Sequence, residues 1–186
     1  YILVLLTIVF TSVSCEVDDL ATDLNLTEAS VPNITKLPLP IAQSISRASI
    51  AAGNVTFGVK VDRGLGEIKS LDLIGFYTYG PTNARVTTAP VVLKSGITTF
   101  PVNFEFNQND LITAFPYLTS IISFVNGDVL TVTANITMND GRVIKMMNDD
   151  GSNNYGAEFN GSVLFKVKQT RSEEHTSELQ SRHNRG

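Results

Sequence analysis

Apolar and polar residues alternate along most of the chain after residue 54, with the period of two that is typical of half-buried β-strands. Residues 54–61, for example, place Val55, Phe57, Val59 and Val61 on one face. Turn residues interrupt the pattern every eight to twelve positions. The strands that we expect are residues 54–61, 68–79, 85–93 with a bend at Pro90, 98–106, 128–138, 142–147 and 162–168.

One segment departs from this alternation. Residues 107–118 carry Leu111, Ile112 and Phe115 at helical spacing behind an Asn/Asp start, and Pro116 is positioned to end a helix. We therefore expect one or two helical turns that cross between the sheets. Together the pattern predicts an all-β fold, an immunoglobulin-like antiparallel sandwich of about seven strands with one short helix. A small barrel is the competing architecture, because the Cys-Trp-Cys hallmark of antibody domains is absent.

Composition narrows the function classes. The chain has 186 residues, of which 42% are hydrophobic, and this is enough apolar material for one packed domain. No apolar run reaches the roughly 18 residues of a membrane-spanning helix. A formal net charge of −4 argues against a nucleic-acid partner, and a single Cys excludes an intramolecular disulfide or a Cys-based zinc site.

The final residues differ from the rest of the chain. Residues 171–181 (RSEEHTSELQS) match the in-frame translation of a common sequencing adaptor, so we interpret residues 171–186 as an artefactual tail. Both histidines, His175 and His183, lie in this tail. Without it, a His-based metal site or a Ser-His-Asp triad lacks an essential member.

The first residues predict an export signal and an anchor. Residues 2–10 form an apolar run of nine residues, which suits a signal peptide and is too short to span a bilayer. Residues 12–15 (SVSC) resemble a bacterial lipobox, and the acidic residues 16–19 (EVDD) resemble the signal that sends Bacteroidota lipoproteins to the outer face of the outer membrane. Cys15 would then be lipidated. The alternative is an ordinary secreted protein that is cleaved nearby.

These features predict four parts of the chain. Residues 1–15 form the signal peptide with the lipobox Cys, residues 16–40 a polar tether, residues 41–170 the sandwich domain and residues 171–186 the tail. The tether contains three prolines and shows little periodicity, and it is also able to supply a first edge strand.

Two groups of residues are candidates for ligand binding. Residues 148–154 (NDDGSNN) are rich in oxygen ligands, and Asp149, Asp150 and Asn153 are candidates for a Ca²⁺ site; an Asx-rich surface loop explains the same residues. Tyr79, Tyr155 and Phe159 are candidates for an aromatic platform against which sugar rings stack. The alternative is that these aromatic side chains belong to the core.

An enzymatic role is disfavoured. The carboxylates available for a glycosidase pair are Asp72, Glu105, Asp110 and Glu158, and no motif brings any two of them together. We therefore expect no catalytic residues and no required cofactor.

A series of short motifs resembles a known group of proteins. The motifs are Asp110-Leu-Ile, Phe115-Pro, Gly127-Asp128, Asp140-Gly-Arg-Val143, Asn148-Asp-Asp-Gly151 and Phe165-Lys-Val167. Their order is similar to that in small accessory lipoproteins encoded beside the outer-membrane glycan transporters of Bacteroidota. The resemblance implies a non-enzymatic, lipid-anchored protein of the cell surface that captures a polysaccharide, or a peptide, for an outer-membrane transporter complex. A structural or adhesive sandwich that contacts other proteins through strand edges is the alternative.

Overall fold

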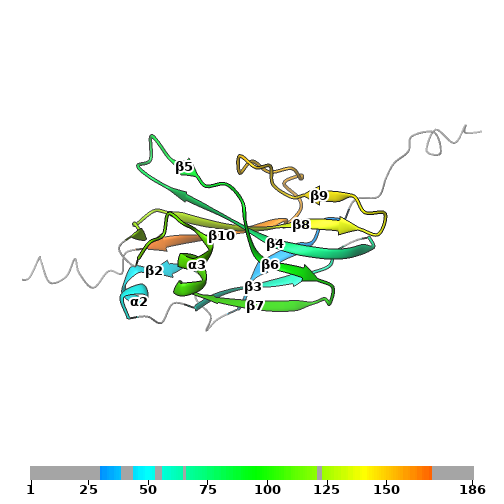
Figure 1. The fold of residues 1–186 in the computed structure, drawn as a ribbon, viewed down its shortest axis with the longest axis horizontal. Coiled ribbons are helices and arrows are strands. Elements are labelled where there is room, and N and C mark those ends of the chain that lie inside the picture. The colour runs from blue at the N-terminus through cyan, green and yellow to red at the C-terminus, as the bar shows by residue number, and fades with distance from the viewer. Residues whose placement is uncertain (1–29, 39–43, 53–55, 65, 121–122, 169–186) are drawn as a thin grey trace, which may run out of the picture.

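Two β-sheets packed face to face form the body of the protein. The computed structural model describes residues 30–38, 44–52, 56–64, 66–120 and 123–168. In this part of the chain ten strands and two short helices are found, and both helices lie towards the same end of the sandwich (Figure 1). The predicted fold class, an all-β antiparallel sandwich, is confirmed.

The smaller sheet has three antiparallel strands. Their order is β1 (Asn33–Lys36), β3 (Thr56–Asp62) and β7 (Val102–Asn107). Ile34 lies opposite Val61, and Phe57 lies opposite Phe106, so that the apolar residues of the three strands share the inner face. This is the alternation that the sequence predicts for β3.

The larger sheet has seven strands built around two long ones. Its main path is β2 (Ile45–Ser46), β10 (Ser162–Lys168), β8 (Val129–Met138), β4 (Ile68–Tyr79) and β5 (Val86–Thr87). In addition, β6 (Val91–Ile97) pairs with β4, and β9 (Val143–Lys145) pairs with β8. Only the short β2–β10 pair is parallel among these strands.

The main core lies between the two sheets. In β4 the side chains of Leu71, Leu73 and Tyr77 point inward and are fully buried. The ring of Phe165 in β10 lies 4.7 Å from the ring of Phe57 in β3, so these two aromatic residues join the sheets directly. Burial of such rings is the main source of the sandwich's stability.

A second, smaller apolar cluster covers the outer face of the large sheet. Ile74 and Phe76 are buried there beneath Met147 and Tyr155, which belong to the segment between β9 and β10. Because β4 is covered on both faces at this point, residues 73–77 are continuously buried instead of alternating.

The predicted helix is present as α3 (Gln108–Ala114). The side chain of Asn107 accepts hydrogen bonds from the main-chain N–H groups of Asn109 and Asp110, and Asp110 Oδ2 accepts one from Asn107 N at 2.7 Å. This reciprocal pair is a capping box. The helix ends at Ala114 with Phe115 as its C-cap, directly before Pro116, as predicted.

Several boundaries differ from the sequence-based expectation. The sandwich begins before residue 41, because β1 lies within the predicted tether and pairs with β3. Ser95-Gly96 does not make the expected turn: β6 continues to Ile97, and the turn falls at residues 98–101. A second helix, α2 (Arg47–Ala51), was not predicted. Its five residues are too few to show a periodic pattern.

Candidate functional site

A groove at one end of the sandwich contains one of the predicted aromatic residues. It has a volume of about 340 Å³, and its lining residues are Val31, Pro32, Asn33, Gly64, Glu158, Phe159 and Asn160. Phe159 is 41% exposed, which is unusual for a large apolar ring. The groove is at the small end of the range of roughly 300–1,000 Å³ that is typical of ligand sites.

Backbone contacts between distant segments form this groove. Ile34 N donates to Asn160 O at 2.7 Å and thereby joins β1 to the segment that precedes β10. Gly64 follows β3 with a φ of +75°, and a Cβ atom at this position would overlap the carbonyl oxygen of Val31. A glycine is therefore needed for the close approach of the two chain segments.

The groove also contains polar side chains. The Asn33 side-chain oxygen is buried and has no hydrogen-bond partner, whereas Glu158 and Asn160 are exposed. A buried acceptor without a donor is uncommon in folded proteins. Phe159, which lines the same groove, offers an exposed apolar ring.

Tyr155 does not line the groove and packs against neighbouring residues. Its hydroxyl lies 2.6 Å from Ser162 Oγ, and its ring fills the space above Gly161, where a Cβ atom would lie 2.7 Å from a ring carbon. The ring also packs on the small cluster of the outer face. Tyr155 therefore has a packing role in this structure, which corresponds to the alternative that the sequence left open.

Tyr79 lies far from the other two predicted aromatic residues. It extends from the inner face of β4, on the side of Tyr77, whereas Tyr155 packs on the outer face. Its ring stacks on that of Tyr117 with a centroid distance of 3.7 Å and an interplanar angle of 15°. The structure thus does not unite Tyr79, Tyr155 and Phe159 in a single platform.

Tyr117 was missed by the sequence analysis. It follows Pro116 just after α3 and is 39% exposed. Its side chain also lies 6.2 Å from the ring of Tyr77, measured between centroids. Desolvation raises the pKa of the Tyr117 phenol, and the nearby Asp128 adds to this effect. The sequence signal that could have identified Tyr117 is its position, since it is an aromatic residue directly after Pro116, the predicted end of the helix.

Tyr77, which lies next to the stacked pair of Tyr79 and Tyr117, makes a buried hydrogen bond. The Tyr77 hydroxyl donates to Asp128 Oδ2 at 2.9 Å, and Val125 N donates to the same oxygen at 3.0 Å. Asp128 is only 2% exposed. Burial, followed by the charge of Asp128, raises the pKa of the Tyr77 phenol far above its usual range.

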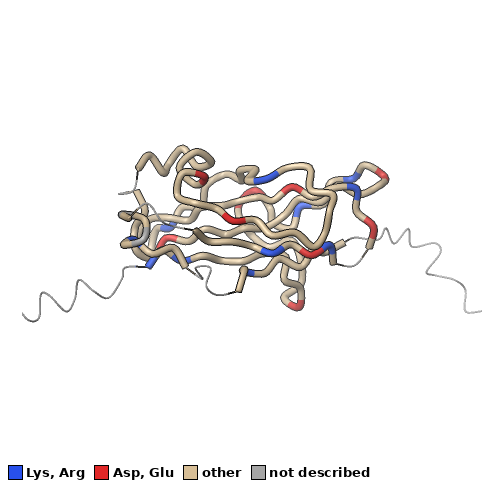
Figure 2. The backbone as a smooth tube through the Cα atoms, turned by 90° about the horizontal axis from the view of Figure 1, so that it is seen from below, with Lys and Arg blue, Asp and Glu red and all other residues tan. Residues whose placement is uncertain are grey.

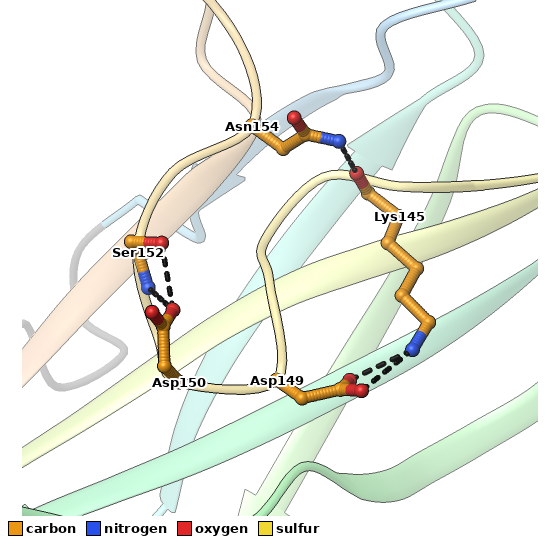
Figure 3. A network of polar contacts seen from close by, with 5 residues as sticks. All are labelled: Lys145, Asp149, Asp150, Ser152 and Asn154. Carbon is orange, nitrogen blue, oxygen red and sulfur yellow. Dashed lines mark hydrogen bonds and ion pairs between the residues drawn. The ribbon is translucent and has the colours of Figure 1, made fainter.

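The predicted calcium ligands point in different directions. Figure 3 shows the Asp149 carboxylate turned towards Lys145, whose Nζ lies 2.8 and 2.9 Å from its two oxygens. Asp150 instead accepts hydrogen bonds from the hydroxyl and the N–H of Ser152, which lower the pKa of the Asp150 carboxyl. Asn153 pairs through its backbone with Met147. This arrangement is that of a hydrogen-bonded Asx loop.

The other carboxylates are distributed over separate elements. Asp72 Oδ1 accepts a hydrogen bond from Gly96 N at 2.8 Å, and Asp110 caps α3. Within the described residues, no three His, Cys, Asp or Glu side chains gather as a metal site would require. Along the described backbone, acidic and basic positions are interspersed (Figure 2).

Comparisons with known proteins do not add a functional assignment. No model of a known protein family matches the chain, and no curated protein is similar to it in sequence. Among the described residues there is no helix of sufficient length and apolarity to span a bilayer. Cys15 and the tail of residues 171–186 lie outside the described residues.

Proposed function

We propose that this protein is a non-enzymatic binding protein that captures a polysaccharide through the groove beside Phe159. The observation that carries the proposal is the exposed Phe159 ring in a groove that Asn33 also lines. A sugar offers both matching features, since its ring has an apolar C–H face and its hydroxyl groups donate hydrogen bonds. Asn160 and Glu158 supply further polar groups at the edge of the groove.

The cellular setting of this proposal comes from the sequence. Lipidation of Cys15 would hold the domain on the outer membrane, at the cell surface, where it would act as an accessory to a nutrient-uptake transporter. Two or more acyl chains give stable anchoring. Anchoring raises the effective concentration of captured glycan beside the transporter, which is the mechanism that we propose.

A non-enzymatic role is part of the proposal. General acid–base catalysis requires a titratable group that is free to exchange a proton with the substrate. Asp72 and Asp110 are each engaged by main-chain N–H groups, and Glu158 is a single exposed carboxylate in the groove. A glycosidase needs a second carboxylate across the sugar ring from the first.

Glycan-binding measurements with the full chain test the proposal. We expect one polysaccharide in a panel to bind, and Phe159→Ala to weaken that binding by about tenfold or more, since stacking on the ring is lost. Leu164→Ala is the matched control, because Leu164 is 50% exposed and lies outside the groove. Binding that is equal in both variants would contradict the groove assignment, and new reducing ends would contradict a non-enzymatic role.

The second candidate function is an adhesive or structural module. It is favoured by β7, which pairs only with β3 among the described strands and is therefore an open sheet edge. Strand addition at this edge would join neighbouring proteins. Oligomers that persist without any glycan, measured by analytical ultracentrifugation, would support this function over capture by single molecules.

A further inference from the structure

A second surface site lies where β4 ends, away from the Phe159 groove. Its apolar part is the stacked pair of Tyr79 and Tyr117, in which Tyr117 is 39% exposed. Its distance from the groove follows from the strand register. Ser162, just after the groove, lies opposite Thr133, whereas Thr78 lies opposite Val129, so the two sites are at least about 13 Å apart along β8.

Arg85 supplies a fixed positive charge beside these tyrosines. One terminal nitrogen of its guanidinium, NH2, donates to Gly127 O at 2.7 Å and to Thr78 O at 3.1 Å. Thr78 directly precedes Tyr79, and Val86, directly after Arg85, lies opposite Tyr79 in the sheet. The two main-chain carbonyls thus hold the guanidinium at the end of β4, next to the main chain of Tyr79.

The charge of Arg85 is not neutralised by an ion pair. Among the described residues, the salt bridges involve Lys60, Arg63, Arg142 and Lys145, and no carboxylate lies within salt-bridge distance of Arg85. Nearby Asp128 is buried and directs Oδ2 at the Tyr77 hydroxyl and at Val125 N. The Arg85 Nε and NH1 groups have no partner within this part of the chain, which leaves donors for a ligand.

We propose that Arg85, Tyr79 and Tyr117 form a binding site for an acidic sugar, a uronic acid unit of a polysaccharide. The sugar ring would stack on Tyr117, and its carboxylate would accept a hydrogen bond from the NH1 group of Arg85. A hydrogen bond between two charged groups is stronger than a neutral one, and a stacked aromatic ring matches the apolar face of the sugar. Because the guanidinium is already held in place, little side-chain entropy is lost on binding.

Trigalacturonic acid and its fully methyl-esterified form are the probes that test this site with the full chain. The ester keeps the sugar rings and removes the carboxylate charge. We expect the acid to bind, the ester to bind at least about tenfold more weakly, and the affinity for the acid to fall as salt is raised. Equal affinity for acid and ester, or no binding of the acid, would overturn the proposal.

Variants separate the two parts of the site. Arg85→Lys keeps the charge and loses the guanidinium that the two main-chain carbonyls hold in place, and Tyr117→Ala removes the stacking ring, so each should weaken acid binding by about tenfold. Tyr117→Phe and Arg142→Ala are the matched controls, since the first keeps a ring and the second removes an exposed arginine from the turn between β8 and β9. Unchanged binding in Tyr117→Ala would overturn the stacking role. A circular-dichroism melt checks that each variant is folded.

This inference does not depend on the groove beside Phe159. Phe159→Ala should weaken capture in the groove by about tenfold or more and leave binding of trigalacturonic acid unchanged. If Tyr117→Ala and Arg85→Lys bind the acid normally while Phe159→Ala loses the polysaccharide, the acidic site is wrong and the proposed function stands. If trigalacturonic acid binds and no variant at Phe159 changes the binding of any glycan, the acidic site stands and the proposed function of the groove is wrong.

Discussion

The hydrogen bond between Tyr77 and Asp128 lets a carboxylate remain in the interior of the sandwich. Asp128 is 2% exposed, and its Oδ2 atom is shared by the Tyr77 hydroxyl and by Val125 N. A buried carboxylate that loses one of two donors keeps its desolvation cost without compensation. This pair therefore links β4 to the start of β8 by a contact that the core requires.

The first prediction concerns the Tyr77 hydroxyl at neutral pH. Tyr77→Phe should lower the free energy of unfolding by about 1–3 kcal/mol, because Asp128 loses its side-chain donor while the ring remains in the core. Urea denaturation monitored by circular dichroism measures the change. The matched control is Tyr155→Phe, whose hydroxyl contacts only the Ser162 hydroxyl in a half-buried position and should cost less. Equal losses in both variants would contradict the special role of Asp128.

The second prediction concerns alkaline pH. Burial raises the pKa of Tyr77 in the folded protein, so the unfolded chain releases this proton first, near its usual pKa of about 10. Above that pH the unfolded state binds fewer protons than the folded state, and stability must fall as pH rises. Urea denaturation at about pH 8 and about pH 11 should show a smaller loss in Tyr77→Phe than in the natural sequence. The same loss in both proteins would show that other groups cause it.

Side-chain direction within a strand can be predicted from the sequence, whereas contacts between distant residues cannot. Phe76 and Tyr79 face opposite sides of the sheet, as the period of two in a strand requires. The pairing of Tyr79 with Tyr117 joins positions 38 residues apart, and periodicity contains no information on such a contact. The unpartnered oxygen of Asn33 is likewise a property of the folded groove alone.

Elements differ in how far local sequence determines them. The strands at residues 68–79 and 162–168 have the predicted bounds, because both are bounded by turn residues and carry strong β-formers. The segment between β9 and β10 could not be placed in advance. Its position over Ile74 and Phe76 depends on contacts with a strand some 70 residues earlier in the chain.

The third prediction concerns the cap of α3. Asn107→Ala should lower the free energy of unfolding by about 1 kcal/mol, since two N–H groups at the start of the helix lose their acceptor. Asn107→Asp is the matched control, because aspartate accepts the same hydrogen bonds and should retain most of the stability. Chemical denaturation of both variants measures the difference. If Asn107→Asp is as unstable as Asn107→Ala, the capping box does not explain the role of Asn107.

The fourth prediction concerns the Asx loop after β9. Addition of Ca²⁺ should leave the melting temperature unchanged, because both Asp149 oxygens are held by Lys145 and Asp150 binds Ser152. Differential scanning calorimetry with Ca²⁺ and with a chelator measures this directly. Lys145→Met releases Asp149 and serves as a comparison. A rise in melting temperature that Ca²⁺ produces in the natural sequence would restore the calcium hypothesis.

On the scale of the whole molecule, the two sheets are joined by aromatic contacts across the core. The Phe165 ring lies against Phe57, and Lys36 Nζ lies 4.8 Å from the centre of the same Phe165 ring. The sandwich class was predictable because it needs only the alternation and the frequency of turns. The parallel pairing of β2 with β10 was not, since two residues of strand carry no pattern.

The fifth prediction tests the contact between the two sheets that Phe165 makes. Phe165→Ala should lower the free energy of unfolding by about 3–5 kcal/mol, because a fully buried ring is replaced by a cavity between the sheets. Leu164→Ala changes the adjacent residue, which is 50% exposed, and should cost well under 1 kcal/mol. Guanidinium denaturation followed by circular dichroism compares the two. Similar costs would mean that β10 does not join the sheets in solution.

The position of β10 has a consequence for when the chain folds. This strand lies between β2 and β8 in the large sheet, and its Phe165 contacts Phe57 of the small sheet, yet among the described strands it is the last to emerge during synthesis. Until residues 162–168 emerge, β8 lacks its neighbour along residues 129–133, and the core lacks one of its central rings. The contact between Phe165 and Phe57 therefore forms only after the other described strands have been synthesised.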